Sequence, residues 1–182
     1  MKFRNTSSAK TSNGACVERP DGGVIVADAG PLIHLDELHN IHLLETLAPV
    51  LVPEAVWLEV MHHRPTALQS KFLSKQVPTQ AGAELEALAK LYTLHLGEIQ
   101  AIALCNYSPN SRLLTDDTAA RMAAKALGIP ANGTLGVILR ALRLGSLSKS
   151  QTIDLLESIP ASSSLHIKNS LLAEIINEVR NY

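Results

Sequence analysis

The sequence predicts an α/β fold with three layers (α/β/α), in which a short, mostly parallel central sheet lies between helices. Two observations predict it. Short apolar runs, the first at residues 24–27, alternate along the chain with longer segments whose apolar residues recur at helical spacing. Glycine, proline and aspartate flank these runs and mark turns between strands and helices. Strands that alternate with helices form parallel pairs through right-handed crossovers, so their carboxyl ends open on one edge of the sheet.

The composition favours one well-buried domain with an aliphatic core. The chain has 182 residues, of which 46% are hydrophobic and only 3% aromatic. So few aromatic residues argue against a stacking platform for single-stranded nucleic acid. The formal net charge of −1 provides no global basic field, so nucleic-acid binding would require a local patch.

The cysteines and the apolar runs are typical of a reduced, cytoplasmic protein. Cys16 and Cys105 lack metal-type spacing, and we expect no disulfide. No apolar run reaches the roughly 18 residues of a membrane span, and the polar start of the chain has no signal region. We therefore expect no membrane partner.

We expect three parts along the chain. Residues 1–22 are polar and aperiodic, which predicts a disordered or loosely attached extension. Residues 23–145 carry the alternating strands and helices of the main domain. Residues 146–182 are expected to form a C-terminal helical extension packed on that domain.

The first strand organises the rest of the prediction. Val24 to Ala27 form a β-branched run that suits a strand buried on both faces. Asp28 lies where this strand leaves the sheet, Gly30 permits a tight turn, and Pro31 suits the first turn of a helix. Because ligands of open α/β sheets bind at the carboxyl ends of strands, Asp28 is a candidate working group. The alternative is that it only caps the following helix.

The remaining elements follow from the same patterns. Further strands are predicted at 49–53, 112–115 and 129–131. Helices are predicted at 31–38, 41–47, 54–62, 81–92, 96–107, 118–127, 134–144, 149–158 and 165–179. We expect Gly128 to end one of these helices and Pro160 to stop another, and residues 63–79 support no prediction.

Five carboxylates occupy special places on these elements. Asp28 and the pair Asp116–Asp117 follow strands, so a parallel sheet brings them to one edge. Glu59 and Glu98 lie in apolar helical stretches, where a charge is costly unless it is paired or bound to metal. A hard divalent cation would relieve the mutual repulsion, and oxygen ligands suit Mg²⁺ or Mn²⁺. The pattern therefore predicts a divalent-metal site.

Each acid also has a purely structural interpretation. Glu98 can be a first-turn glutamate favoured by the helix dipole, and Glu59 can be a solvated helix position. Asp116 or Asp117 can be the N-cap of the next helix.

In order and spacing, these motifs resemble the PIN-domain nuclease family, and most of all its VapC-like branch, the toxins of prokaryotic toxin–antitoxin pairs. The resemblance covers residues 23–145 and makes the main domain PIN-like. It rests on the segments VADAGPLI, VPEAVWLEV, LGEIQAIAL, LLTDDTAAR and GIPANGTLGVIL.

The resemblance implies a cluster of acids that holds Mg²⁺ or Mn²⁺ for hydrolysis of RNA phosphodiester bonds. By position, Asp28, Glu59 and Asp117 match family acids, and Glu98 stands where many members carry aspartate. These four are the implied catalytic residues, and Asp28, Glu98, Asp117 and the extra carboxylate Asp116 are the implied metal ligands. Many members carry Ser or Thr two residues after the first aspartate, where this chain has Gly30.

Four further side chains are candidates for contact with RNA. Thr115 and Thr134 can orient water or phosphate, or can cap backbone groups instead. Arg121 and Lys125 lie four residues apart on the helix that leaves the acidic edge. Arg121 can alternatively pair with Asp117.

The expected function is that of a metal-dependent endoribonuclease, and two other functions stay open. A phosphatase of the haloacid dehalogenase kind needs a second acid two residues after its nucleophile, where Gly30 stands. A catalytically degenerate PIN-like module would act through homodimer or antitoxin contacts. The apolar stripes of residues 31–47 and 165–180 fit such contacts, and equally fit ordinary core packing.

Overall fold

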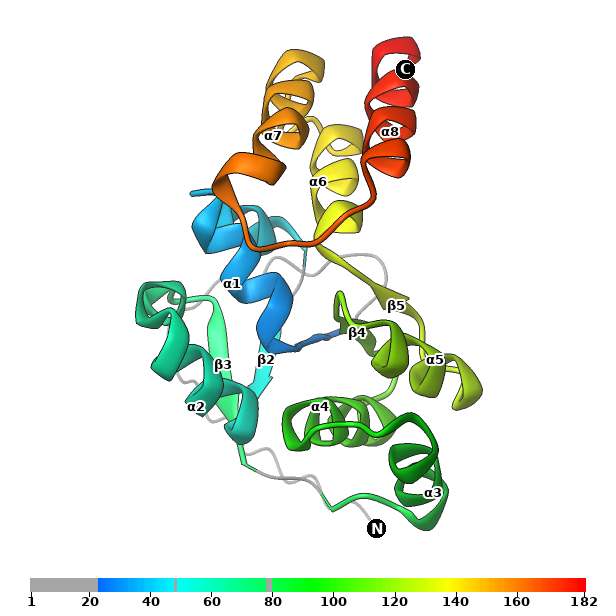
Figure 1. Ribbon diagram of the computed structural model, residues 1–182. Helices are drawn as coiled ribbons and strands as arrows, with labels where there is room; N and C mark the ends of the chain where they lie inside the picture. Colours follow the sequence, from blue (N-terminus) through cyan, green and yellow to red (C-terminus); the bar gives the residue numbers. More distant parts are fainter. Residues whose placement is uncertain (1–22, 48, 78–79) are drawn as a thin grey trace, which may run out of the picture.

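The computed structural model describes residues 23–47, 49–77 and 80–182, and it contains a five-stranded parallel sheet. The strand order is β3-β2-β1-β4-β5, with β1 in the middle (Figure 1). Every described pairing is parallel, which confirms the predicted fold class. The strands are β1 (Ile25–Ala27), β2 (Val50–Pro53), β3 (Leu73–Gln76), β4 (Arg112–Leu114) and β5 (Ala131–Asn132).

The central strand β1 is buried on both faces, as its β-branched sequence predicts. Ile25 and Ala27 belong to one core cluster and Val26 to the other, because successive side chains of a strand point to opposite faces. Ala27 pairs in register with Leu114 of β4, and the Asp28 amide donates to the Leu114 carbonyl at 2.9 Å. Asp28 therefore leaves the sheet level with the end of β4.

Helices cover both faces of this sheet. The core cluster that contains Val26 is built with α3, α4 and α5, and the cluster that contains Ala27 with α1, α2, α6, α7 and α8. Figure 1 shows α6, α7 and α8 grouped beyond α1, away from α3 and α4. The helices are α1 (Ala29–Glu37), α2 (Glu54–His63), α3 (Ala83–Tyr92), α4 (Leu96–Tyr107), α5 (Thr118–Ala126), α6 (Thr134–Arg143), α7 (Lys149–Ser162) and α8 (Asn169–Asn181), with 3₁₀ turns η1 (Ile41–Thr46) and η2 (Pro65–Gln69).

The predicted elements differ from the observed ones where the apolar pattern is weak. The segment at 41–47 is a 3₁₀ turn, the last strand lies at 131–132, and α8 starts at Asn169. Strand β3 went unpredicted because its Leu-Ser-Lys-Gln sequence lies at the sheet edge and is largely exposed. The expectation that Pro160 ends a helix is wrong, since α7 continues to Ser162. Proline removes a single backbone donor there, and buried neighbours such as Leu156 and Ile159 hold the turn against the core.

The C-terminal helices share the core of the sheet. Leu156 and Ile159 of α7 and Ile176 and Val179 of α8 are buried in the same cluster as Ala27. Leu35 and Leu44, from the other apolar stripe, are buried there too. These positions of both stripes pack in the core, whereas Leu171 of α8 is exposed.

Three other sequence expectations concern the chain as a whole. Cys105 is buried and free, whereas Cys16 and the predicted extension at 1–22 lie outside the described residues. In the described part of the chain, no helix combines the length and the hydropathy that crossing a bilayer requires.

We predict that truncation of Leu156 destabilises the whole domain. Its side chain is fully buried, so Leu156→Ala should lower the free energy of unfolding by about 2–5 kcal/mol in chemical denaturation. Leu144→Ala is the matched control, because Leu144 is 52% exposed and should change stability by less than about 1 kcal/mol. Equal losses in both variants would contradict a shared core.

Candidate active site

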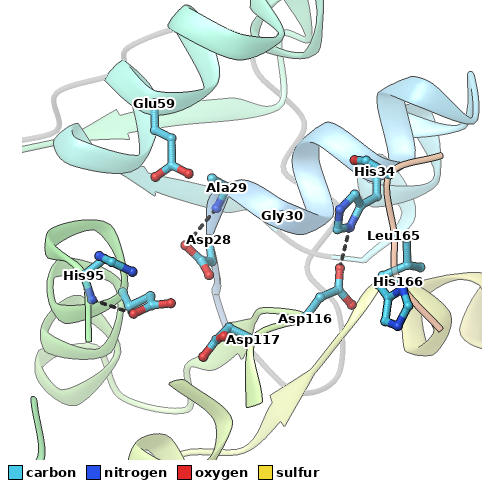
Figure 2. Close-up of a pocket in the computed structure, with 12 residues that line it drawn as sticks. Asp28, Ala29, Gly30, His34, Glu59, His95, Asp116, Asp117, Leu165 and His166 are labelled. Carbon is cyan, nitrogen blue, oxygen red and sulfur yellow. Dashed lines mark hydrogen bonds and ion pairs between the residues drawn. The ribbon is translucent and has the colours of Figure 1, made fainter. Parts of the chain in front are cut away.

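One pocket opens where the predicted strand ends meet. Its volume is about 410 Å³. All five predicted carboxylates line it, although three follow the strands β1 and β4 and two lie on the helices α2 and α4. Figure 2 shows Asp28, Glu59 and Asp117 directed toward a common space, with His34, Asp116 and His166 to one side. The parallel topology therefore brings the acids together as predicted.

Asp28 is the most buried of these acids, with 8% of its surface exposed. Its Oδ1 accepts from the Ala29 amide at 2.9 Å and its Oδ2 from the Thr115 hydroxyl at 2.8 Å. Burial raises its pKa from 3.8 to about 6, against the two hydrogen bonds, and the nearby charges of Glu98 and Glu59 add to the rise. Asp28 thus caps α1. It also lines the pocket with a carboxylate whose ionised form is disfavoured by burial.

Glu59 reaches the pocket from α2, beside the start of α4. A Cβ built on Gly97 would lie 3.2 Å from Val56 Cγ2, 3.5 Å from Glu59 Oε2 and 3.9 Å from Asp28 Oδ1. The missing side chain at Gly97 therefore lets α4 pack closely against Val56 of α2, and Glu59 and Asp28 lie at ordinary contact distance from the same position. Glu59 itself accepts no hydrogen bond from the part of the chain that the structure describes.

Glu98 combines a structural role with a place in the pocket. Its Oε2 accepts from the His95 amide at 2.7 Å, so it stabilises the first turn of α4. Burial raises its pKa, the bond from His95 opposes the rise, and the negative charges of Asp117 and Glu59 support it. These charge effects place Glu98 in the same electrostatic group as Asp28, Glu59 and Asp117.

Asp117 is the N-cap of α5, as the structural interpretation proposed. Its Oδ1 accepts from the Ala120 amide at 2.7 Å. Its own amide donates to the Thr115 hydroxyl at 3.1 Å, which ties it to the group that holds Asp28. The alternative pairing with Arg121 is not among the ion pairs of the described residues.

Asp116 faces a different set of partners from its neighbour. Its Oδ1 accepts from the Thr134 amide at 2.7 Å, and its Oδ2 accepts from the Thr134 hydroxyl at 2.5 Å and from His34 Nδ1 at 2.9 Å. Burial would raise its pKa, but the bonds from His34 and Thr134 outweigh burial and lower it. A Cβ at Gly133 would overlap Asp116 Oδ1, so this arrangement needs glycine there. Asp116 lines the same pocket as the other four acids, but both of its oxygens are engaged by Thr134 and His34.

The four candidate RNA contacts divide into two pairs. Thr115 and Thr134 are fully buried, and their hydroxyls donate to Asp28 and Asp116, so neither side chain reaches a ligand directly. Arg121 and Lys125 are exposed and line a separate hollow of about 570 Å³ beside β5. The structure therefore does not bring these two cations into the acidic pocket.

Three histidines line the pocket that the sequence analysis did not single out: His34, His95 and His166. His34 lies one helical turn after Gly30, a spacing that could have identified it. His166 had no such signal, because it lies in the segment between α7 and α8, far in sequence from the acids of the pocket. That segment is tied to the end of α1, where Glu37 accepts from the Ser163 hydroxyl at 3.0 Å and the Ser164 amide at 2.7 Å.

The chemistry of the donor set fits a hard divalent cation. Asp28, Glu59, Glu98 and Asp117 offer carboxylate oxygens in one pocket. Burial is the main cause of the raised pKa of Asp28, and the negative charges of Glu98 and Glu59 add to it. Within the described ranges, however, no three Asp, Glu, His or Cys side chains are grouped closely enough to form a ready-made metal centre. The four side chains would have to close together around an ion.

Comparison with known proteins identifies the family of the chain. A family model described as a PIN domain matches residues 24–181, a span that includes α7 and α8. Among solved structures, a PilT N-terminus domain protein from the hyperthermophilic archaeon Sulfolobus solfataricus P2 is similar, with 14% sequence identity and a TM-score of 0.48. That similarity covers 65% of this chain and 93% of the other. No curated protein matches the chain.

We predict that Asp28→Asn becomes more stable relative to the parent as pH rises. A native pKa of about 6, against 3.8 for an ordinary aspartate, means that the native state binds the proton more tightly. The parent therefore loses stability between about pH 4 and pH 6, by on the order of 2–3 kcal/mol, and the variant does not. Urea unfolding in EDTA at the two ends of this range measures the difference.

The exposed Asp154 of α7 supplies the control for loss of one negative charge, through Asp154→Asn. If the difference in the free energy of unfolding between Asp28→Asn and the parent does not change with pH, the raised pKa of Asp28 is contradicted.

Proposed function

The chain belongs to the PIN domain family, and from this premise we propose that it is a metal-dependent endoribonuclease of the VapC-like toxin type. The observation that carries the proposal is the convergence of Asp28, Glu59, Glu98 and Asp117 on one pocket at the carboxyl edge of the sheet. A buried carboxylate beside other carboxylates is unfavourable by itself, and a bound cation would offset that cost.

In this proposal Asp28, Glu98 and Asp117 hold one or two Mg²⁺ or Mn²⁺ ions, and Glu59 faces them from α2. When bound, such an ion would supply a Lewis acid that lowers the pKa of water and offsets negative charge on a phosphate. The chain contributes the positioning: the Thr115 hydroxyl binds both Asp28 Oδ2 and the Asp117 amide. One buried hydroxyl therefore fixes the ends of β1 and β4 relative to each other.

The hollow beside α5 supports RNA as the substrate. Asp117 begins α5 at the acidic pocket, and Arg121 and Lys125 follow on the same helix. Contacts of these two cations with successive phosphates would supply affinity with little sequence information. As partners of a toxin of this type, we propose a cognate antitoxin and a second copy of the chain.

A degenerate binding module is the second candidate function. It is favoured by the lack of a ready-made three-ligand group among the described residues and by the helix-capping roles of Glu98 and Asp117. A haloacid-dehalogenase-like phosphatase has no comparable support, since Gly30 places no acid two residues after Asp28.

We predict that the parent protein cleaves a mixed RNA pool with Mn²⁺, and that Asp28→Asn and Asp117→Asn do not. The expected loss exceeds about 100-fold, because even the outer-shell partners of a metal ligand commonly account for 10–100-fold. Gel analysis measures cleavage. A thermal shift with Mn²⁺ should show stabilisation of the parent and not of Asp28→Asn.

The control variant is again Asp154→Asn, which should cleave like the parent. Equal cleavage by every variant would indicate contamination and end the nuclease proposal. A folded parent that neither cleaves RNA nor gains stability from Mn²⁺ would identify the binding module instead.

A further inference from the structure

The hollow beside β5 adjoins the acidic pocket at the start of α5. Asp117 lines the acidic pocket, and Thr118, the next residue, lines the hollow. Arg121 and Lys125 follow along the same face of α5, about 6 Å apart along the helix axis. Figure 1 shows α5 beside β5, which forms the other wall. A chain bound at the acidic pocket can therefore continue into the hollow.

One part of the hollow is cationic. Arg121 and Lys125 are exposed, and neither forms an ion pair within the part of the chain that the structure describes. Arg64, Lys75 and Arg180 are each paired with a carboxylate instead. No aspartate or glutamate is among the described residues that line the hollow. The two cations are therefore free to pair with negative charges of a ligand.

The other part of the hollow is apolar. Met122 is 50% exposed and lies between the two cations in the sequence of α5. Ile129, Pro130 and Ala131 face it from the segment that leads into β5. Methionine is unbranched and polarizable, so it adapts to the flat surface of a ring. A ligand of this hollow would combine a flat apolar part with negative charge, as a nucleotide does.

The edge of the sheet adds polar groups to the apolar part. The Leu113 amide donates to the Pro130 carbonyl at 2.9 Å. The Thr115 amide donates to the Asn132 carbonyl at 2.8 Å. Because successive residues of a strand turn their peptide groups to opposite sides, the N–H and C=O of Ala131 point away from β4. β5 is the last strand of the described sheet, so no further strand pairs with these two groups.

We propose that the hollow binds the nucleotide next to the one at the acidic pocket, in a single-stranded RNA. The nucleobase packs on Met122 and Pro130, its edge bonds to the Ala131 peptide groups, and the phosphates pair with Arg121 and Lys125. This inference rests on the proposed function and adds a base-binding subsite to its phosphate contacts. The base must be unpaired to enter, so the substrate is single-stranded.

The test separates contacts with bases from contacts with the backbone. It uses two fluorescein-labelled oligomers of equal length and charge, a single-stranded RNA and an oligomer in which every nucleotide lacks its base. Fluorescence anisotropy in EDTA measures both dissociation constants without turnover. We expect the parent protein to bind the RNA about tenfold more tightly than the oligomer without bases.

Three variants assign this preference to the hollow. Met122→Ala removes apolar surface and no charge, so it should lower the preference for bases to about threefold. Lys125→Ala should weaken both oligomers by the same factor and lower the dependence of log Kd on log salt by about one unit of slope. Met61→Ala is the matched control, because Met61 of α2 is 48% exposed and should bind as the parent does. Thermal unfolding verifies that all three variants fold.

Three outcomes would overturn the proposal. The first is a Met122→Ala variant that keeps the full preference of the parent for bases. The second is a parent that binds both oligomers equally or binds neither. The third is tighter binding of a labelled acidic peptide of the same charge than of the RNA, which would assign the hollow to a protein partner.

The result is distinguishable from the outcome of the cleavage assay. A parent that cleaves RNA with Mn²⁺ while Met122→Ala keeps the preference for bases would retain the nuclease and lose the subsite. A parent that does not cleave while Met122→Ala loses the preference would retain the subsite and lose the nuclease.

Discussion

The rest of the structure depends on one constraint, which is that a nearly buried carboxylate stands at the end of the central strand. Desolvation makes the charge of Asp28 costly, and the protein compensates with the Ala29 amide and the Thr115 hydroxyl. Because β1 lies between β2 and β4, the elements that follow these two strands deliver Glu59 and Asp117 to the same edge. The pocket is thus a consequence of strand order together with the burial of one aspartate.

Much of this fold could be predicted because its central strands are apolar and its helices keep regular spacing. β1, β2 and β4 are core strands, and burial selects the Val, Ile and Leu residues that reveal them. β3 lies at the edge with polar residues, and β5 has only two residues, so neither leaves an apolar run in the sequence. The prediction that α7 stops at Pro160 was wrong because burial of Ile159 in the core outweighs the tendency of proline to end a helix.

The sequence allowed us to predict which acids line the pocket. It did not allow us to predict that Asp116 and Asp117 have different partners. Adjacent aspartates after a strand give no sign of which one faces the other acids. That division is decided by Gly133 and Thr134, which arrive after β5 and hold Asp116. The place of His166 depends in the same way on contacts between distant segments, so composition and spacing give no sign of it. His34 differs, because its spacing of one helical turn from Gly30 was a usable signal.

The tie between Glu37 and the segment that follows α7 has a mechanical consequence. Helix α1 begins beside Asp28 and ends at Glu37. One end of this helix therefore lies at the acidic pocket, and the other end binds the segment that leads to α8. Ser164, Leu165 and His166 form part of the pocket wall because that attachment holds them there. The last two helices are therefore not a removable appendage: a chain cut before α7 would lose a wall of its own pocket along with part of its core.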